Sequence, residues 1–214
     1  MAGAAGRGGD RLRVCAPSPL AVDRGHVYVV PVVIGDLLDL SHPPDFGGRA
    51  ITAIHLHHEG GGDETDDAHR IEDVALSRTD QHFARIPYHL VVTRPILAAD
   101  GLPVPLPENP WRVTEGRPLR LTPASVKGHN EGAVAIVVAG RWDKDPLPAW
   151  ALDRIVEACV WICMATGLGA DDIHGHRELA PTLCPGYDPA LVRVAVAARL
   201  SVLRAVDTSI VGAP

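Results

Sequence analysis

The chain has 214 residues, of which 46% are hydrophobic and 21% charged, and this is the composition of a globular protein with a buried core. Its formal net charge of −6 provides no basic surface of the kind that binds phosphate backbones, so we exclude nucleic acid as a partner. No apolar run reaches the ~20 residues that a membrane span requires. We therefore expect one globular domain without a membrane span, and a monomer.

The first half of the chain contains two predicted strands and one predicted helix. Residues 50–58 (AITAIHLHH) are β-branched and alternate in polarity near their end, which favours a strand that the following EGGGD turn ends. Apolar residues at helical spacing predict a polar helix over about 66–79, and residues 88–93 (YHLVVT) predict a second strand. Residues 95–123 are rich in proline and show no periodicity, so we expect a long loop there.

The second half is more regular. Residues 132–140 (GAVAIVVAG) are apolar on both faces, which predicts a strand in the centre of a sheet. Residues 148–167 predict a long helix with one apolar side, 172–175 a short strand, and 189–206 a final amphipathic helix. This order of elements predicts an α/β fold, in which a single domain contains a mixed central β-sheet flanked by helices.

The two ends of the chain are interpreted as lying outside this domain. Residues 1–48 are irregular, begin with a small-residue tail over 1–10, and predict an N-terminal extension with one or two short strands. The domain itself covers 49–206, and 207–214 predict a flexible tail. No apolar segment follows a basic start, so we predict no signal peptide and expect synthesis in the cytoplasm.

The four cysteines differ in their surroundings. Cys159 and Cys163 lie in an apolar helical stretch and are interpreted as small core residues. A chain of this size with a full core does not need disulfides. Cys184 is different, because it lies in a loop directly before Pro185 and is followed by polar sequence.

Three residues with metal-ligand chemistry lie where predicted strands end. His57 closes the strand over 50–58, His176 follows the short strand at 172–175, and Cys184 comes eight residues later. Two imidazoles and one thiolate suit one Zn²⁺ ion, and three protein ligands leave the fourth position open for water, which is the pattern of a catalytic site. Such a metal lowers the pKa of its water to about 7 and polarises a carbonyl oxygen.

Spacing alone does not choose among the histidines. His55 lies on the same strand face as His57, whereas His58 points to the opposite face. The same ambiguity exists between His174 and His176. A histidine on a strand is more often a polar surface residue than a ligand, so all these alternatives remain open at this point.

Four segments in this order, AIHLHHEGG, IPYHLVV, HNEGAVAIVVAG and HGHRELAPTLCPG, resemble the amidase-2 family. This family includes phage lysozymes of the amidase type and peptidoglycan recognition proteins. The resemblance covers about residues 50–190 and is most specific in the segment that ends in CPG. It implies that His57, His176 and Cys184 bind zinc, and that the fold is a mixed central sheet with helices on its faces.

The resemblance also implies two catalytic side chains. Tyr88 corresponds to the catalytic tyrosine of the family, and it would lie near His57 if the second strand ran antiparallel to the first. Its hydroxyl would orient water or stabilise an oxyanion, the alternative being a core tyrosine. Thr182 stands where phage relatives carry lysine, and its hydroxyl can donate one hydrogen bond to the reacting carbonyl. The alternative for Thr182 is that it shapes the loop.

The sequence departs from the family pattern at several positions. Glu59 stands where many relatives have Ser or Thr, and Ser125 replaces a frequent histidine, with His129 nearby as a substitute. Relatives that recycle cell wall in the cytoplasm carry a catalytic Glu where this chain has Val137, and an Asp where it has Cys184. Both differences argue against the recycling subtype.

The expected function follows from the resemblance. It implies a zinc-dependent hydrolase that cleaves the amide bond between N-acetylmuramic acid and L-alanine, with the muramyl peptide of peptidoglycan as its partner. Lysis of bacterial cell walls, with release by a phage-type route, would agree with the missing signal peptide. Two alternatives are a peptidoglycan-binding module without catalysis and a zinc amide hydrolase that acts on another peptide-like substrate.

Overall fold

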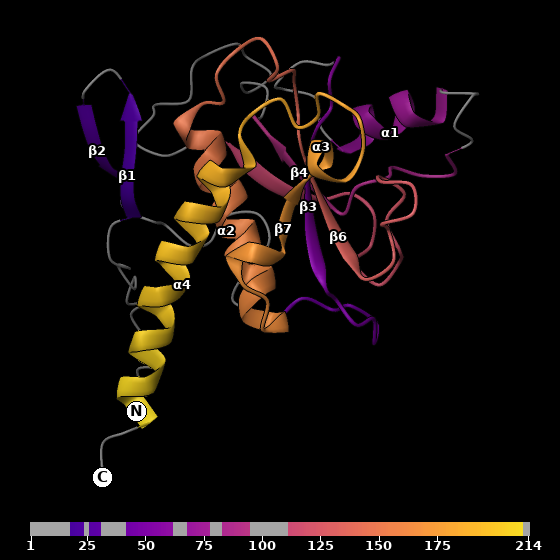
Figure 1. The fold of residues 1–214 in the computed structure, drawn as a ribbon. Coiled ribbons are helices and arrows are strands. Elements are labelled where there is room, and N and C mark those ends of the chain that lie inside the picture. The colour runs from indigo at the N-terminus through magenta and orange to yellow at the C-terminus, as the bar shows by residue number, and fades with distance from the viewer. Residues whose placement is uncertain are drawn as a thin grey trace, which may run out of the picture. The chain divides into compact units, whose positions relative to one another are not determined.

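The computed structural model describes residues 18–23, 26–30, 42–61, 68–77, 83–94 and 111–211. The chain divides into two compact units, Met1–Ile34 and Gly35–Pro214. The first unit contains an antiparallel hairpin of β1 (Ser18–Asp23) and β2 (His26–Val30), both within the predicted N-terminal extension (Figure 1). The small-residue tail over 1–10 and Cys15 lie outside the described residues.

The second unit is built on a mixed sheet of five strands (Figure 1). The strands are β3 (Ala53–His58), β4 (Leu90–Thr93), β5 (Arg112–Glu115), β6 (Ala133–Val138) and β7 (Ile173–Gly175). Their order across the sheet is β5-β4-β6-β3-β7, and every neighbouring pair is parallel except β4 with β5. The α/β fold with a mixed central sheet is therefore confirmed.

Strand β6 occupies the centre of this sheet, as its apolar sequence predicts. All six of its residues are buried, and it pairs with β3 on one side and β4 on the other. A strand covered on both faces needs apolar side chains at every position, because neither face meets water. The uninterrupted sequence AVAIVV meets this requirement.

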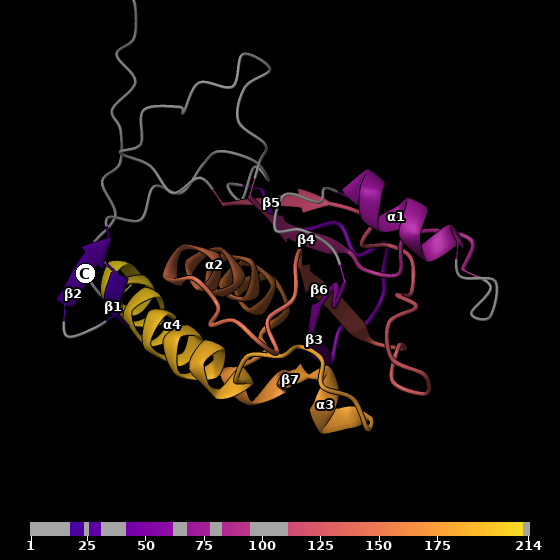
Figure 2. The same cartoon turned by 90° about the horizontal axis from the view of Figure 1, so that it is seen from above.

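Helices cover both faces of the sheet. The long helices α2 (Ala149–Thr166) and α4 (Pro189–Val211) lie together on one face, and α1 (Ala68–Ser77) lies on the other (Figure 2). The larger core cluster lies under α2 and contains the predicted core residues Cys159 and Cys163. Two short helices, η1 (Ala170–Asp172) and α3 (His176–Leu179), flank β7. No helix among the described residues is long and apolar enough to cross a bilayer.

The structure corrects three expectations. Strands β3 and β4 are both parallel to β6, so the second predicted strand does not run antiparallel to the first. Strand β5 lies within 95–123, where we expected no regular structure, while residues 95–110 are outside the described part. It was missed because it is a four-residue edge strand with exposed polar ends and only one partner. Helix α4 continues past Val206 as far as Val211, into the predicted tail.

Candidate metal centre

The sheet places the two candidate histidine ligands side by side. His57 is the penultimate residue of β3 and is fully buried, and His176 follows β7 as the first residue of α3. Because β3 and β7 are parallel neighbours with Leu56 paired to Gly175, their carboxyl ends lie together. The ring centroids of His57 and His176 are 4.8 Å apart.

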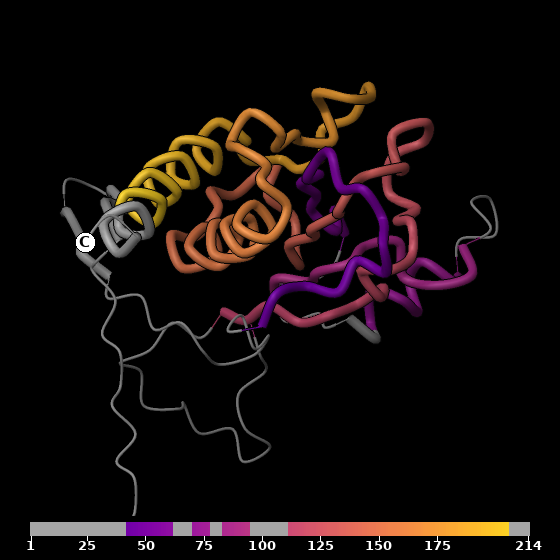
Figure 3. The backbone as a smooth tube through the Cα atoms, turned by 90° about the horizontal axis from the view of Figure 1, so that it is seen from below, coloured from indigo at the N-terminus to yellow at the C-terminus, as the bar shows by residue number. Residues whose placement is uncertain are grey.

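Cys184 lies in the loop that connects α3 to α4, and Figure 3 shows the backbone of this loop in the orange part of the chain. Its Sγ lies 3.6 Å from Nδ1 of His57 and accepts a hydrogen bond from the backbone N–H of His58 at 3.3 Å. The carbonyl oxygen of Cys184 accepts a 2.7 Å hydrogen bond from the backbone N–H of Arg177, which ties the loop back onto α3. Cys184 is thus buried and is held by hydrogen bonds to both its carbonyl oxygen and its sulfur.

The geometry of these three side chains suits a tetrahedral metal ion. One ligand atom from each of His57, His176 and Cys184 lies within 4.8 Å of the others. Zinc bonds of about 2.3 Å to sulfur and 2.0 Å to nitrogen at a tetrahedral angle place S and N about 3.5 Å apart. The observed 3.6 Å between Cys184 Sγ and His57 Nδ1 agrees with this value.

The pKa shifts of the group follow from its burial. Burial, with His176 as the next cause, lowers the pKa of His57 well below its usual value, and burial lowers the pKa of His176. Both imidazoles are therefore neutral, as metal ligands must be. Burial raises the pKa of Cys184 to about 12, although the hydrogen bond with the His58 backbone opposes this. A coordinated metal reverses this preference, because its charge stabilises the thiolate.

The structure separates the other strand histidines from this group. His58 points to the opposite face, where its Nδ1 accepts a hydrogen bond from the backbone N–H of Trp142 at 3.2 Å. His55 lies on the face of His57 but is next to His174, with ring centroids 6.3 Å apart. Within the described part of the chain, the only cluster of three metal-ligand side chains contains His57 and His176 rather than these neighbours.

Tyr88 lies beside the metal group, although not for the reason expected from the sequence. Its ring centroid is 5.0 Å from that of His57. His57 pairs with Val137 in the parallel register, so both side chains lie on one face, and Tyr88 packs against the apolar cluster that contains Val137. The long side chain of Tyr88, and not an antiparallel strand start, brings it to the site.

A cleft of about 130 Å³ opens next to these residues. It is lined by apolar side chains and a few polar ones: Glu59, Ile71, Val74, Ala75, Phe83, Pro87, Tyr88, Ala124, Ser125 and His176. The apolar side of α1 thus forms part of the wall of the cleft. The periodicity of the α1 sequence could not indicate this role, because the same pattern fits a helix that packs against a core. Such a mixture of an apolar wall and few polar groups is typical of small-molecule sites.

Thr182 and the remaining histidines lie outside this cleft. Thr182 is exposed, and its Oγ1 accepts a hydrogen bond from the backbone N–H of Cys184 at 3.2 Å, which supports the loop around the thiol. His129 is also exposed. His89 is buried, accepts the N–H of Ala135 at Nδ1 and lies 2.8 Å from the carbonyl of Leu121 at Nε2, so it is a core residue.

Comparison with known proteins agrees with this fold. Residues 47–187 match the family model described as N-acetylmuramoyl-L-alanine amidase, which confirms the resemblance carried by the motifs. A search of curated proteins finds no match.

Three solved structures are similar in fold. The endolysin amidase LysCS from Clostridium intestinale has a TM-score of 0.54 at 15% identity, over 68% of this chain and 83% of that one. The Ph2119 endolysin from a Thermus scotoductus bacteriophage has a TM-score of 0.53 at 21% identity, over 70% and 86%. Drosophila peptidoglycan recognition protein SD has a TM-score of 0.50 at 21% identity, over 69% and 85%. At these identities the similarity concerns the fold.

Proposed function

The chain belongs to the N-acetylmuramoyl-L-alanine amidase family, and on this basis we propose that it is a zinc-dependent hydrolase of the amide bond between N-acetylmuramic acid and L-alanine in peptidoglycan. Hydrolysis adds water across the C–N bond, leaving a carboxylate on the lactyl group of the sugar and a free amino group on L-alanine. The family match supports the reaction, and the group of His57, His176 and Cys184 supports the metal.

One observation carries the proposal: the buried Sγ of Cys184 lies 3.6 Å from Nδ1 of His57, with His176 in the same group and at the edge of the cleft. His57, His176 and Cys184 would hold one Zn²⁺ ion. When bound, zinc supplies Lewis-acid polarisation of a carbonyl and lowers the pKa of water to about 7. Three ligands are the number that leaves a position open for this chemistry.

The other residues act on the substrate itself. Tyr88 lines the cleft next to His176, and its phenolic O–H would donate a hydrogen bond to the carbonyl oxygen as negative charge develops there. Thr182 lies outside the cleft, where its Oγ1 accepts the N–H of Cys184; its O–H would donate to the substrate only from this loop, at the rim of the site. The apolar wall of α1 would exclude water around the scissile bond, which strengthens these hydrogen bonds.

Two rival functions predict different products. A peptidoglycan-binding module would retain the cleft but would not cleave, and the complete ligand group with Cys184 favours the enzyme over this alternative. A zinc hydrolase of another peptide-like substrate would use the same metal but a different cleft occupant. The family match to N-acetylmuramoyl-L-alanine amidase favours the muramyl peptide.

The decisive experiment is a digest of purified peptidoglycan with and without a chelator. We expect new L-alanine amino termini that disappear on chelation and return when Zn²⁺ is added. Release of reducing sugar ends instead would assign a glycosidase, and binding of peptidoglycan by the zinc-loaded protein without cleavage would assign the binding module. A digest of short peptides that lack the sugar tests the third function.

A further inference from the structure

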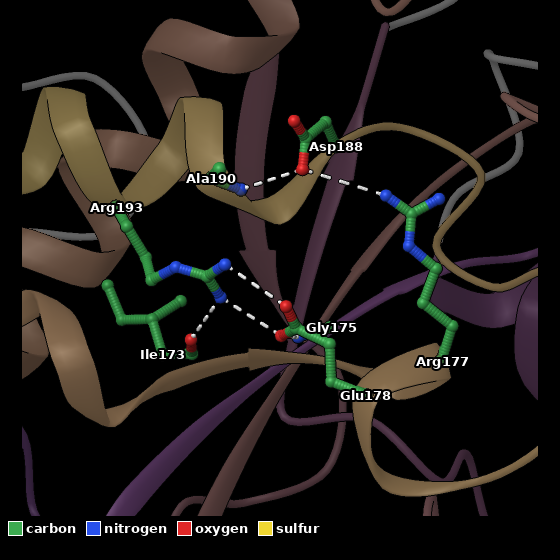
Figure 4. Close-up of polar contacts among 7 residues, drawn as sticks. All are labelled: Ile173, Gly175, Arg177, Glu178, Asp188, Ala190 and Arg193. Carbon is green, nitrogen blue, oxygen red and sulfur yellow. Dashed lines mark hydrogen bonds and ion pairs between the residues drawn. The ribbon is translucent and has the colours of Figure 1, made fainter.

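The first turns of α4 contact the segment that carries His176. The guanidinium of Arg193 donates from Nη1 to Glu178 Oε2 at 2.9 Å and from Nη2 to Glu178 Oε1 at 3.0 Å (Figure 4). Its Nη1 also donates to the carbonyl oxygen of Ile173 in β7 at 3.0 Å. One side chain of α4 is therefore bonded to both the strand before His176 and the helix that begins at it.

Glu178 extends this contact to the residue next to His176. Its Oε2 accepts the backbone N–H of Gly175 at 2.7 Å, so one carboxylate joins Arg193 to the N-terminal end of α3. Gly175 also packs so closely on Pro189 that a side chain at this position would collide with it. Gly175 and Glu178, which lie before and after His176 in the chain, thus both contact α4.

The Cys184 side of the loop is attached to the same helix. Asp188 accepts the backbone N–H of Ala190 in the first turn of α4 at 3.1 Å and forms an ion pair with Arg177 at 3.7 Å (Figure 4). The backbone N–H of Arg177 in turn donates to the carbonyl of Cys184. The segments that carry His176 and Cys184 are therefore both connected to α4, the first through Arg193 and the second through Asp188.

We propose that Arg193 is a positioning residue of the metal centre, which holds His176 at the correct distance from His57 and Cys184 through Glu178 and the Ile173 carbonyl. The proposal rests on the zinc site of the proposed function. A bidentate arginine–carboxylate pair has a defined geometry that lysine cannot reproduce. Partners that orient metal ligands typically change metal affinity by ~10–100-fold when they are removed.

The helix offers a matched control for this arginine. Arg204 is also in α4 and donates to the backbone carbonyl of Leu168 at 3.0 Å, in the segment after α2, which carries no proposed ligand. Arg193→Met and Arg204→Met therefore remove the same kind of side chain from the same helix. Arg193→Met removes the contacts to Glu178 and Ile173 beside His176, whereas Arg204→Met removes the contact with Leu168.

The test measures zinc affinity by competition with a chelator, together with the absorption bands of the Co²⁺-loaded protein. We expect Arg193→Met to weaken zinc binding ~10–100-fold and to alter the cobalt bands, and Arg193→Lys to restore part of the affinity. Glu178→Gln should weaken binding less than Arg193→Met, and the double variant no more than Arg193→Met alone, because both act through one pair. Arg204→Met should stay within about twofold of the wild type.

Other outcomes overturn the proposal. A zinc affinity unchanged in Arg193→Met, even with a lower melting temperature of the metal-free protein, would make Arg193 a structural contact only. An equal loss in Arg204→Met would point to a general weakening of α4. If Arg193→Met does not fold, the lysine and glutamine variants carry the same comparison, and a wild type that binds no zinc overturns the proposed function as well.

Discussion

Nδ1 of His57 and Sγ of Cys184 lie 3.6 Å apart although 127 positions separate them in the chain. The contact forms because the carboxyl end of β3 lies beside the loop after α3. The backbone N–H of His58 donates a hydrogen bond to the sulfur there. Both side chains are buried, and burial shifts the pKa of each toward its uncharged form. A bound divalent cation would instead stabilise the thiolate of Cys184, so the first expectations concern the metal.

Replacing Cys184 by Ser should reduce bound zinc and amidase activity together. An alcohol is a weaker ligand than a thiolate for Zn²⁺, and the two histidines alone do not complete a catalytic site. Zinc content by atomic absorption and release of L-alanine amino termini would be measured on the same sample. Cys163→Ala is the control, because Cys163 is a free, buried cysteine of the core cluster outside the metal group. Full activity in the Cys184 variant would show that the ligand assignment is wrong.

Tyr88→Phe should lower kcat by about 10²–10³-fold and leave zinc content unchanged, because the loss of one oxyanion donor has this magnitude. The ring would still pack against the cluster on its sheet face, so stability should change little. Tyr187→Phe is the matched control, since the Tyr187 hydroxyl is buried and makes no hydrogen bond with any residue that the structure describes. An equal loss of kcat in both variants would contradict a role specific to Tyr88.

Two variants of Thr182 test whether its hydroxyl donates to the substrate or only supports the loop around Cys184. Its Oγ1 accepts the N–H of Cys184, so Thr182→Val removes both this bond and the proposed donor, whereas Thr182→Ser keeps both. We expect the valine variant to lose roughly fivefold in kcat, as about 1 kcal/mol for one hydrogen bond implies, and the serine variant to retain activity. A loss confined to zinc affinity, with kcat of the zinc-loaded enzyme unchanged, would leave Thr182 the loop-shaping role alone.

His89 should make stability depend on pH. Burial lowers the pKa of His89 to about 4 from its usual 6.5, although the hydrogen bond to Leu121 opposes this. Nδ1 accepts the N–H of Ala135, so protonation there breaks a buried hydrogen bond. Between these two pKa values the unfolded chain binds more protons than the folded one, so stability is complete above about pH 6.5 and decreases toward pH 4 by up to about 3 kcal/mol.

Urea unfolding from pH 7 to pH 5 tests this dependence on the metal-free protein. His89→Gln should be less stable at pH 7 but should show a flatter curve than the wild type, because glutamine does not titrate. The comparison isolates His89 from the other buried histidines, whose contributions are common to both proteins. If the free energy of unfolding of both proteins changed equally with pH, His89 would not be the source of the pH dependence.

Local sequence was sufficient to predict most of the fold. The apolar run AVAIVV predicts a central strand because both of its faces must avoid water, and β6 is that strand. The periodicity of 148–167 predicts α2, whose core side includes Cys159 and Cys163. The edge strand β5 and the parallel direction of β4 were not predictable in this way, because strand pairing depends on partners distant in the chain and β5 is too short to show a period.

The metal group shows the same division. The order of motifs in the sequence by itself determined the family and named His57, His176 and Cys184 as one set of candidates. Only the tertiary structure brought His57 together with His176 and Cys184 and placed Tyr88 beside it. The physical reason is register: which side chains meet at a sheet edge depends on how β3, β6 and β7 pair, and no single segment contains that information.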